Sequence, residues 1–412
     1  MSSQYPQHRS GTAELTLSAP TGELLADQDV VVAQRRHAFE FGNIGFDLIV
    51  HATGEEDRSR LAADWLALFN TATLPFYWGT FEPVRGRPDT RRLQAAATWF
   101  YERGVRVKGH PLLWHTVKAP WLDSLPTGEV EQVVRARVRR EAHDFAGRVD
   151  TWDAINEVVI MPEFGNEPDG VPNAVSRLAR EVGRVGIVRL AFESAREANP
   201  AARLLINDFD LSSRYERLID ELLEAGIRLD AIGLQTHMHQ GFRGREQLIE
   251  VADRFARFGL PLHFTETSLV SGELMPADVV DLNDHVVSEW PSTSEGEARQ
   301  AEELEQHYRT LVGHPAVAAI TYWGITDRDA WLGAPVGLLR ADGSRKPAYA
   351  ALDALINGEW WLPPTVLRTD HRGRVRVTGF HGDYQVSHGP ATAAFTITGT
   401  PAAVRLTPQQ VR

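Results

Sequence analysis

Apolar positions along most of this chain alternate between two spacings. Short runs rich in β-branched and aromatic residues predict strands near residues 40, 73, 108, 153, 205, 233, 263 and 320. Between them, segments such as YERLIDELLEAG and REQLIEVADRFARFG repeat apolar positions every three or four residues, which predicts helices. Strands that alternate with helices favour a parallel sheet, and eight such pairs predict its closure into a (β/α)8 TIM barrel.

The two ends of the chain show a different pattern. Residues 12–36 predict two strands joined by a turn, and the region after about residue 357 predicts a β-meander with glycine turns. We therefore expect residues 37–356 to form the barrel. Residues 1–36 and 357–412 are expected to form a small, β-sandwich-like accessory domain, with the last dozen residues as a loose tail.

Composition narrows the classes of function. The 412 residues exceed the roughly 250 that one barrel needs, so the accessory domain fits the length. Cysteine is absent, which excludes disulfides, thiol catalysis and cysteine-bound zinc. A net charge of −12 without a basic block makes nucleic acid and anionic membranes unexpected partners. No apolar run reaches the length of a membrane span or a signal-peptide core, so we expect a cytoplasmic protein, or a secreted one if a leader was removed.

Candidate chemistry lies where the predicted strands end, because barrels of this kind carry their catalytic groups there. Two carboxylates stand at such positions, Glu157 after strand 4 and Glu266 at the end of strand 7. Other polar or aromatic residues that end or follow predicted strands are His110, Trp114, His115, Asn156, Asn207, Asp208, Gln235, His237, His239, Trp323, Asp327 and Trp331.

This combination of residue types suits hydrolysis of a glycosidic bond. One carboxyl group donates a proton to the leaving oxygen, and a second, ionised carboxylate attacks the anomeric carbon. Tryptophan rings stack on sugar faces, and amides and histidines bind hydroxyls. His237 and His239 could form a metal pair on one strand, but no Asp or Cys cluster completes the site, so neither a metal nor a cofactor is expected.

Six motifs occur in order, each at a predicted strand end: VKGHPLLWH, WDAINE, LLINDFD, IGLQTHMH, FTET and YWGITDRDAW. Together they resemble glycoside hydrolase family 10, the endo-β-1,4-xylanase family, from about residue 37 to residue 352. The resemblance implies a retaining hydrolysis of β-glycosides, with Glu157 as acid/base and Glu266 as nucleophile. The residues expected to bind the carbohydrate substrate are His110, Trp114, Asn156, Gln235, His237, Trp323, Trp331, Tyr77 and Asn207.

The chain departs from the family pattern on the side that binds the non-reducing end of the sugar chain. The Glu-Asn pair after strand 2 is absent, and Tyr77 stands where the family has a lysine. Val117 replaces a sugar-binding glutamine, and Ser268 replaces the usual aspartate two positions after the nucleophile. These changes predict a weak or blocked −2 subsite.

Four functions follow from this pattern. The family default is an endo-β-1,4-xylanase. The first alternative is a relative that acts on another β-glycoside, such as a decorated oligosaccharide or a plant glycoside with an apolar aglycone. A non-catalytic carbohydrate-binding protein and a metal-dependent hydrolase are the remaining alternatives.

Overall fold

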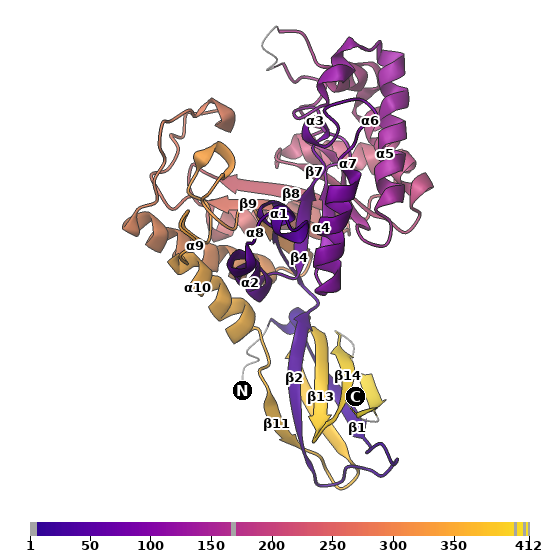
Figure 1. Ribbon diagram of the computed structural model, residues 1–412, viewed down its shortest axis with the longest axis vertical. Helices are drawn as coiled ribbons and strands as arrows, with labels where there is room; N and C mark the ends of the chain where they lie inside the picture. Colours follow the sequence, from indigo (N-terminus) through magenta and orange to yellow (C-terminus); the bar gives the residue numbers. More distant parts are fainter. Residues whose placement is uncertain (1–5, 166–169, 399–401, 407–408, 411–412) are drawn as a thin grey trace.

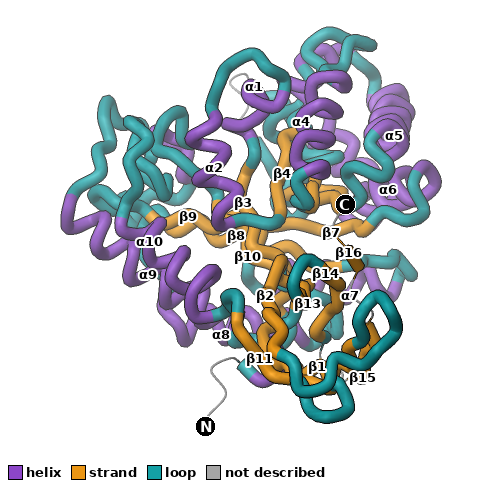
Figure 2. Tube along the Cα trace, turned by 60° about the horizontal axis from the view of Figure 1, so that its bottom comes forward, coloured by secondary structure: helices purple, strands orange, loops and turns teal. Residues whose placement is uncertain are grey.

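The computed structural model describes residues 6–165, 170–398, 402–406 and 409–410. Within these ranges, eight parallel strands close into a barrel in the order β10-β3-β4-β5-β6-β7-β8-β9 (Figure 1 and Figure 2). The barrel strands are β3 (Glu40–Ile44), β4 (Thr71–Pro75), β5 (Arg106–His110), β6 (Thr151–Asn156), β7 (Arg203–Asp208), β8 (Ala231–Met238), β9 (Leu262–Leu269) and β10 (Val317–Tyr322). This arrangement confirms the predicted fold class.

One or two helices follow each barrel strand and surround the sheet (Figure 2). In α7, Tyr215, Leu218 and Leu222 recur at intervals of three and four and are buried, so the apolar stripe of the sequence is the face that covers the barrel. No helix of the described ranges is long and apolar enough to cross a membrane. The helices are α1 (Ile49–Ala52), α2 (Ser59–Leu68), α3 (Trp78–Phe81), α4 (Thr90–Glu102), α5 (Thr127–Asp144), α6 (Ala174–Ala198), α7 (Ser213–Glu224), α8 (Gly244–Ala256), α9 (Ser294–Val312) and α10 (Pro347–Asp353).

Strands from both ends of the chain pair in two further sheets, ordered β12-β1-β15 and β11-β2-β13-β14-β16. Leu15, Val32 and Phe395 belong to one buried apolar cluster that both sheets share, so the sheets pack face to face. The strands are β1 (Ser10–Leu17), β2 (Asp29–His37), β11 (Thr365–Arg368), β12 (Arg374–Phe380), β13 (Gly382–His388), β14 (Ala391–Ile397), β15 (Ala402–Leu406) and β16 (Gln409–Gln410).

The expected loose tail is wrong for the part of the last dozen residues that the structure describes. Strand β15 pairs in parallel with β1, and β16 pairs with β14. The physical reason is that an edge strand leaves backbone N–H and C=O groups unpaired, and an extended tail satisfies them.

The two terminal sheets pack against the amino-terminal ends of the barrel strands (Figure 1). His37, the last residue of β2, lies 2.8 Å through Nε2 from the carbonyl oxygen of Ile356. The imidazole also meets the edges of Phe41 and Phe380 at centroid distances of 5.1 and 5.2 Å. Arg9 donates to the carbonyl of Val312, just before β10. The carboxyl ends of the strands, where the candidate residues lie, therefore face away from these sheets.

Candidate active site

A network of amides joins the two candidate carboxylates at the carboxyl ends of the strands. Asn156 Nδ2 donates to Glu157 Oε1 at 3.2 Å. Asn207 Nδ2 donates to Glu266 Oε1 at 2.7 Å and to Asn156 Oδ1 at 2.8 Å. Gln235 Nε2 donates to the same Asn156 oxygen at 3.0 Å. Five of the predicted residues thus form one hydrogen-bonded group.

Two shifts of strand register aim these side chains at one another. Between β6 and β7 the shift places Asn156 opposite Asn207, and between β8 and β9 another places Gln235 opposite Glu266. An extra residue in one strand re-aims the side chains that follow it, and such bulges are common beside functional sites. Gly233 of β8 leaves room for the Asn207 side chain, because a Cβ at position 233 would lie 2.4 Å from Asn207 Oδ1.

The environment of Glu157 favours a protonated carboxyl group. Burial raises its pKa, the negative charge of Glu266 raises it further, and the value reaches about 8. Trp114 Nε1 donates to Glu157 Oε2 at 2.7 Å, and this hydrogen bond opposes part of the rise. The backbone of Glu157 has a φ of 55°, a left-handed conformation that is uncommon outside glycine. Such strain clusters at functional sites.

The environment of Glu266 favours the ionised form. Burial pushes its pKa upward, but His110 and His237 outweigh that effect, so the pKa lies below its usual value. His237 Nε2 lies 3.2 Å from Oε2 and His110 Nε2 lies 3.8 Å from Oε1. Asp153 fixes the other side of the His110 ring, with Oδ2 2.7 Å from Nδ1, and Lys108 Nζ pairs with that same oxygen at 2.8 Å. The two carboxylates therefore have pKa values displaced in opposite directions.

Two tryptophans from the loop after β10 lie beside His110 and His237. The ring of Trp323 lies 5.2 Å from His110 and 6.1 Å from His237, measured between centroids. The ring of Trp331 lies 4.9 Å from His237 and is 38% exposed. An aromatic face that is open to solvent beside buried polar groups suits a sugar ring.

Tyr77 closes the site on the side of strand β4. Its ring lies 5.6 Å from His110 and 5.5 Å from Trp114. Burial and the charges of Glu266 and Glu157 raise the pKa of Tyr77 well above its usual value, so the phenol stays neutral. The position where the family pattern has a cation thus holds an uncharged aromatic ring.

Phe46 forms an aromatic wall of the site together with Tyr77 and Trp323, although the sequence motifs did not point to it. Its ring lies 6.0 Å from Tyr77 and 5.8 Å from Trp323, both in edge-to-face geometry. Phe46 follows β3 and lies outside the six motifs that resemble the family. Its position two residues after the end of a predicted strand is the signal that would have found it.

Ser268 connects His237 of strand β8 with His239, which directly follows that strand. Its Oγ lies 2.9 Å from His237 Nδ1 and 3.2 Å from His239 Nε2. Within the described ranges, no group of three or more His, Cys, Asp or Glu residues could hold a metal ion.

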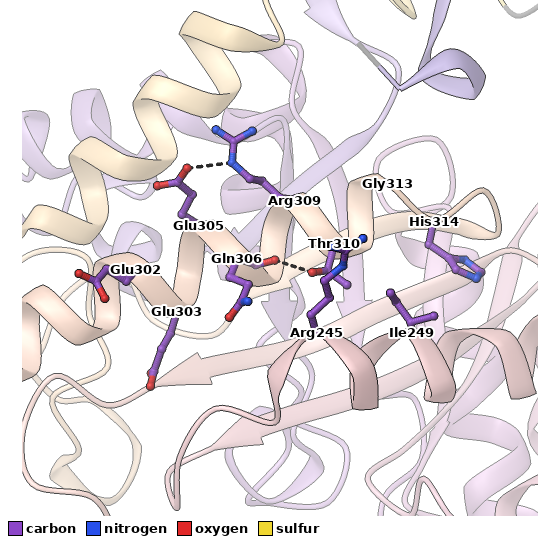
Figure 3. Close-up of a pocket in the computed structure, with 10 residues that line it drawn as sticks. All are labelled: Arg245, Ile249, Glu302, Glu303, Glu305, Gln306, Arg309, Thr310, Gly313 and His314. Atoms are coloured by element: carbon purple, nitrogen blue, oxygen red, sulfur yellow. Dashed lines mark hydrogen bonds and ion pairs between the residues drawn. The ribbon is translucent and has the colours of Figure 1, made fainter. Parts of the chain in front are cut away.

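A cavity of about 760 Å³ lies elsewhere, on the outside of the barrel between α8 and α9 (Figure 3). Arg309 in its wall is paired with Glu305 at 2.8 Å and with Glu359 at 2.6 Å. None of the lining residues ends a barrel strand, so this cavity is separate from the carboxylates.

Comparison with known proteins identifies the family. The family model of glycosyl hydrolase family 10 matches residues 49–354, which is most of the chain. The chain belongs to glycosyl hydrolase family 10. It is accordingly a glycoside hydrolase of the endo-1,4-β-xylanase-like type.

Curated relatives of this family 10 chain carry xylanase names. The endo-1,4-beta-xylanase/feruloyl esterase of Xylanibacter ruminicola is 27% identical, over 64% of this chain and 39% of the relative. Endo-1,4-beta-xylanase 3 of Hypocrea jecorina is 26% identical, over 68% of this chain and 72% of the relative. The chain therefore spans well under half the length of the first and almost three quarters of the second.

Solved structures share the fold. A GH10 structure from Paenibacillus barcinonensis superposes with a TM-score of 0.63 at 23% identity, covering 77% of this chain and 94% of that one. Xylanase 10B from Thermotoga petrophila, in complex with xylobiose, superposes with a TM-score of 0.62 at 22% identity, covering 78% and 94%. Both likenesses cover a little over three quarters of this family 10 chain rather than its full length.

Proposed function

We propose that this protein cleaves a β-glycosidic bond with net retention, with Glu266 as nucleophile and Glu157 as acid/base. The observation that carries the proposal is the opposite displacement of the two pKa values. Near neutral pH, the Glu157 carboxyl group is protonated and gives its proton to the leaving oxygen. The ionised Glu266 attacks the anomeric carbon as the bond to that oxygen breaks, which forms a glycosyl ester.

The second step follows from the same electrostatics. The ester carries no charge, so one cause of the raised pKa of Glu157 disappears when the ester forms. The pKa of Glu157 then falls, and its carboxylate accepts a proton from a water molecule. That water attacks the anomeric carbon, the ester bond breaks, and Glu266 leaves as a carboxylate while Glu157 is protonated again.

The surrounding side chains support sugar binding at the reacting carbon. Asn156 and Gln235 present amide groups next to Glu157, and they suit the sugar hydroxyls that flank the reacting bond. Trp331 offers an exposed aromatic face for the sugar ring.

Two substrates follow from different observations. The xylanase names of the relatives favour the family default, internal cleavage of β-1,4-linked xylan. The contact between Phe46 and Tyr77 favours the second candidate, a β-glycoside with little sugar beyond the reacting residue on the non-reducing side, or with an apolar group there. A wall of aromatic rings offers few hydrogen bonds to an additional sugar.

The mechanism is tested with Glu157→Gln and Glu266→Gln, with the exposed Glu163→Gln as a matched control. Both site variants should lose at least about a hundredfold in kcat, whereas the control should not. A 2-deoxy-2-fluoro aryl glycoside should label the peptide that contains Glu266, and the first product seen by NMR should keep the β configuration. Wild-type turnover in either site variant, or an inverted product, would overturn the proposal.

The substrate is tested by comparing kcat/KM for an aryl xyloside, the matching aryl xylobioside and linear xylan. The second candidate predicts that the second xylose raises kcat/KM little in the wild type. Phe46→Ala, which opens the aromatic wall, should raise kcat/KM for the xylobioside. Strong internal cleavage of linear xylan, together with efficient use of the xylobioside by the wild type, would leave only the family default.

A further inference from the structure

A line of hydrogen bonds leads from the candidate nucleophile into the protein. His237 Nε2 lies 3.2 Å from Glu266 Oε2. On the other side of the ring, Nδ1 lies 2.9 Å from Ser268 Oγ, and that oxygen lies 3.2 Å from His239 Nε2. Ser268 can take part because it lies two residues after Glu266 on β9, and alternate side chains of a strand point the same way.

The positions of the protons follow from what each group can donate. The Glu266 carboxylate only accepts, so His237 donates through Nε2, and in the neutral ring Nδ1 is then an acceptor. The Ser268 hydroxyl must therefore donate to Nδ1, which leaves its oxygen to accept from His239 Nε2–H. His239 Nδ1 has no hydrogen-bond partner within the described part of the chain, so the single ring proton belongs on Nε2.

His239 suits the role of a fixed donor. It is 1% exposed, and burial lowers its pKa to about 3, so the ring stays neutral with one proton. Its ring is held between Trp331 at 5.3 Å and Trp290 at 6.0 Å. The direction of its Nε2–H toward Ser268 is thus set by packing.

We propose that His239, acting through Ser268, is a positioning residue that keeps His237 in the tautomer that donates to the nucleophile. This inference rests on the proposed role of Glu266. Without the Nε2–H of His239, the Ser268 hydroxyl can turn and accept from a proton on Nδ1 of His237. A bare Nε2 would then face the Glu266 carboxylate, and two acceptors repel each other.

A carboxylate at position 268 would work differently. It accepts from Nδ1 of His237 through its charge and has no hydroxyl that needs orientation. His239 is therefore needed because position 268 holds a serine, and replacing that serine with aspartate should make His239 dispensable.

Replacing His239 with phenylalanine leaves the other charged and titratable neighbours unchanged. Those that face Glu266 are Tyr77, His110, Asp153, Glu157 and His237, and those that face His239 are His237 and His285. A change in the ionisation of Glu266 on replacing His239 can therefore be attributed to the hydrogen bonds that run through Ser268.

The test is the acid limb of kcat/KM against pH for His239→Phe, which keeps a planar ring between the two tryptophans. Loss of the donor to Glu266 should raise the pKa of that carboxyl group and move the limb up by about one pH unit. Ser268→Ala, which removes the hydroxyl between His237 and His239, should move the limb in the same direction. Trp290→Phe, which keeps an aromatic ring beside His239 and removes the indole N–H donated to the Glu273 carbonyl, is the control and should leave the limb in place.

The double variant Ser268→Asp with His239→Phe decides the assignment. Its acid limb should match that of Ser268→Asp alone. An unchanged limb in both His239→Phe and Ser268→Ala, or an equal shift for His239→Phe in the serine and aspartate backgrounds, would overturn the inference. Labelling by the 2-fluoro glycoside tests the role of Glu266 separately from the positioning role of His239. Label on Glu266 in all variants upholds that role whatever the limb does, and label on another residue removes both.

Discussion

The hydrogen bond from Trp114 to Glu157 gives the sharpest prediction about the pH range of this enzyme. The indole Nε1–H donates to Glu157 Oε2 at 2.7 Å and so holds the pKa of that group down, against burial and the charge of Glu266. Trp114→Phe removes the N–H and keeps an aromatic ring beside Tyr77. This hydrogen bond stabilises the ionised form of Glu157 more than the protonated form. Its loss should therefore raise the pKa of Glu157 above about 8.

The size of the shift follows from the strength of such a bond. A hydrogen bond to a charged group contributes about 1.5–3 kcal/mol, and one pKa unit corresponds to about 1.4 kcal/mol. Complete loss would therefore raise the pKa by about one to two units. Glu157 is only partly buried, and Gln235 Nε2 remains 3.4 Å from its other oxygen. We therefore expect a rise of about one unit.

The assay is the alkaline limb of kcat/KM. Because the first step needs protonated Glu157, activity is lost as pH rises through its pKa, and Trp114→Phe should move this limb to higher pH. The substrate should have a poor leaving group that requires protonation. A dinitrophenyl glycoside, which leaves without a proton, should show no such shift. Trp121→Phe, whose indole donates instead to the carbonyl of Glu82, is the matched control. An alkaline limb that stays in place or moves down would refute the reasoning.

Three further predictions test other parts of the site and of the fold. Glu266→Gln removes the neighbouring charge and should lower the pKa of Glu157 below about 8, measured by NMR titration of the labelled carboxyl carbon; an unchanged value would show that the two groups do not interact. Gly233→Ala should displace Asn207 and lower kcat at least tenfold, roughly the loss expected when one positioned hydrogen bond is broken, with a smaller effect on KM. Burial lowers the pKa of His115 to about 3, so only the unfolded state binds its proton as pH falls below about 6.5, and folding stability is lost there. His115→Phe should flatten the dependence of the unfolding free energy on pH in that range by about 1.4 kcal/mol per pH unit, measured by urea unfolding, and an unchanged slope would contradict this account.

The sequence by itself determined the elements and the end of the barrel where chemistry occurs. The stripe of Tyr215, Leu218 and Leu222 is a local property of one helix, so its period predicts both the helix and its buried face. Glu157 and Glu266 could be singled out because closing a parallel barrel brings all strand ends to one side, whatever loops join them.

Only the tertiary structure decided which side chains touch. Contacts such as Gln235 opposite Glu266 depend on a shift of strand register, and a shift of one residue changes which side chains face each other without altering the local pattern. Phe46 meets Tyr77 because two loops of unrelated sequence follow paths that no local preference encodes. The pKa values of the two carboxylates are likewise set by burial and by charges far apart in the chain, which exist only once the barrel has closed.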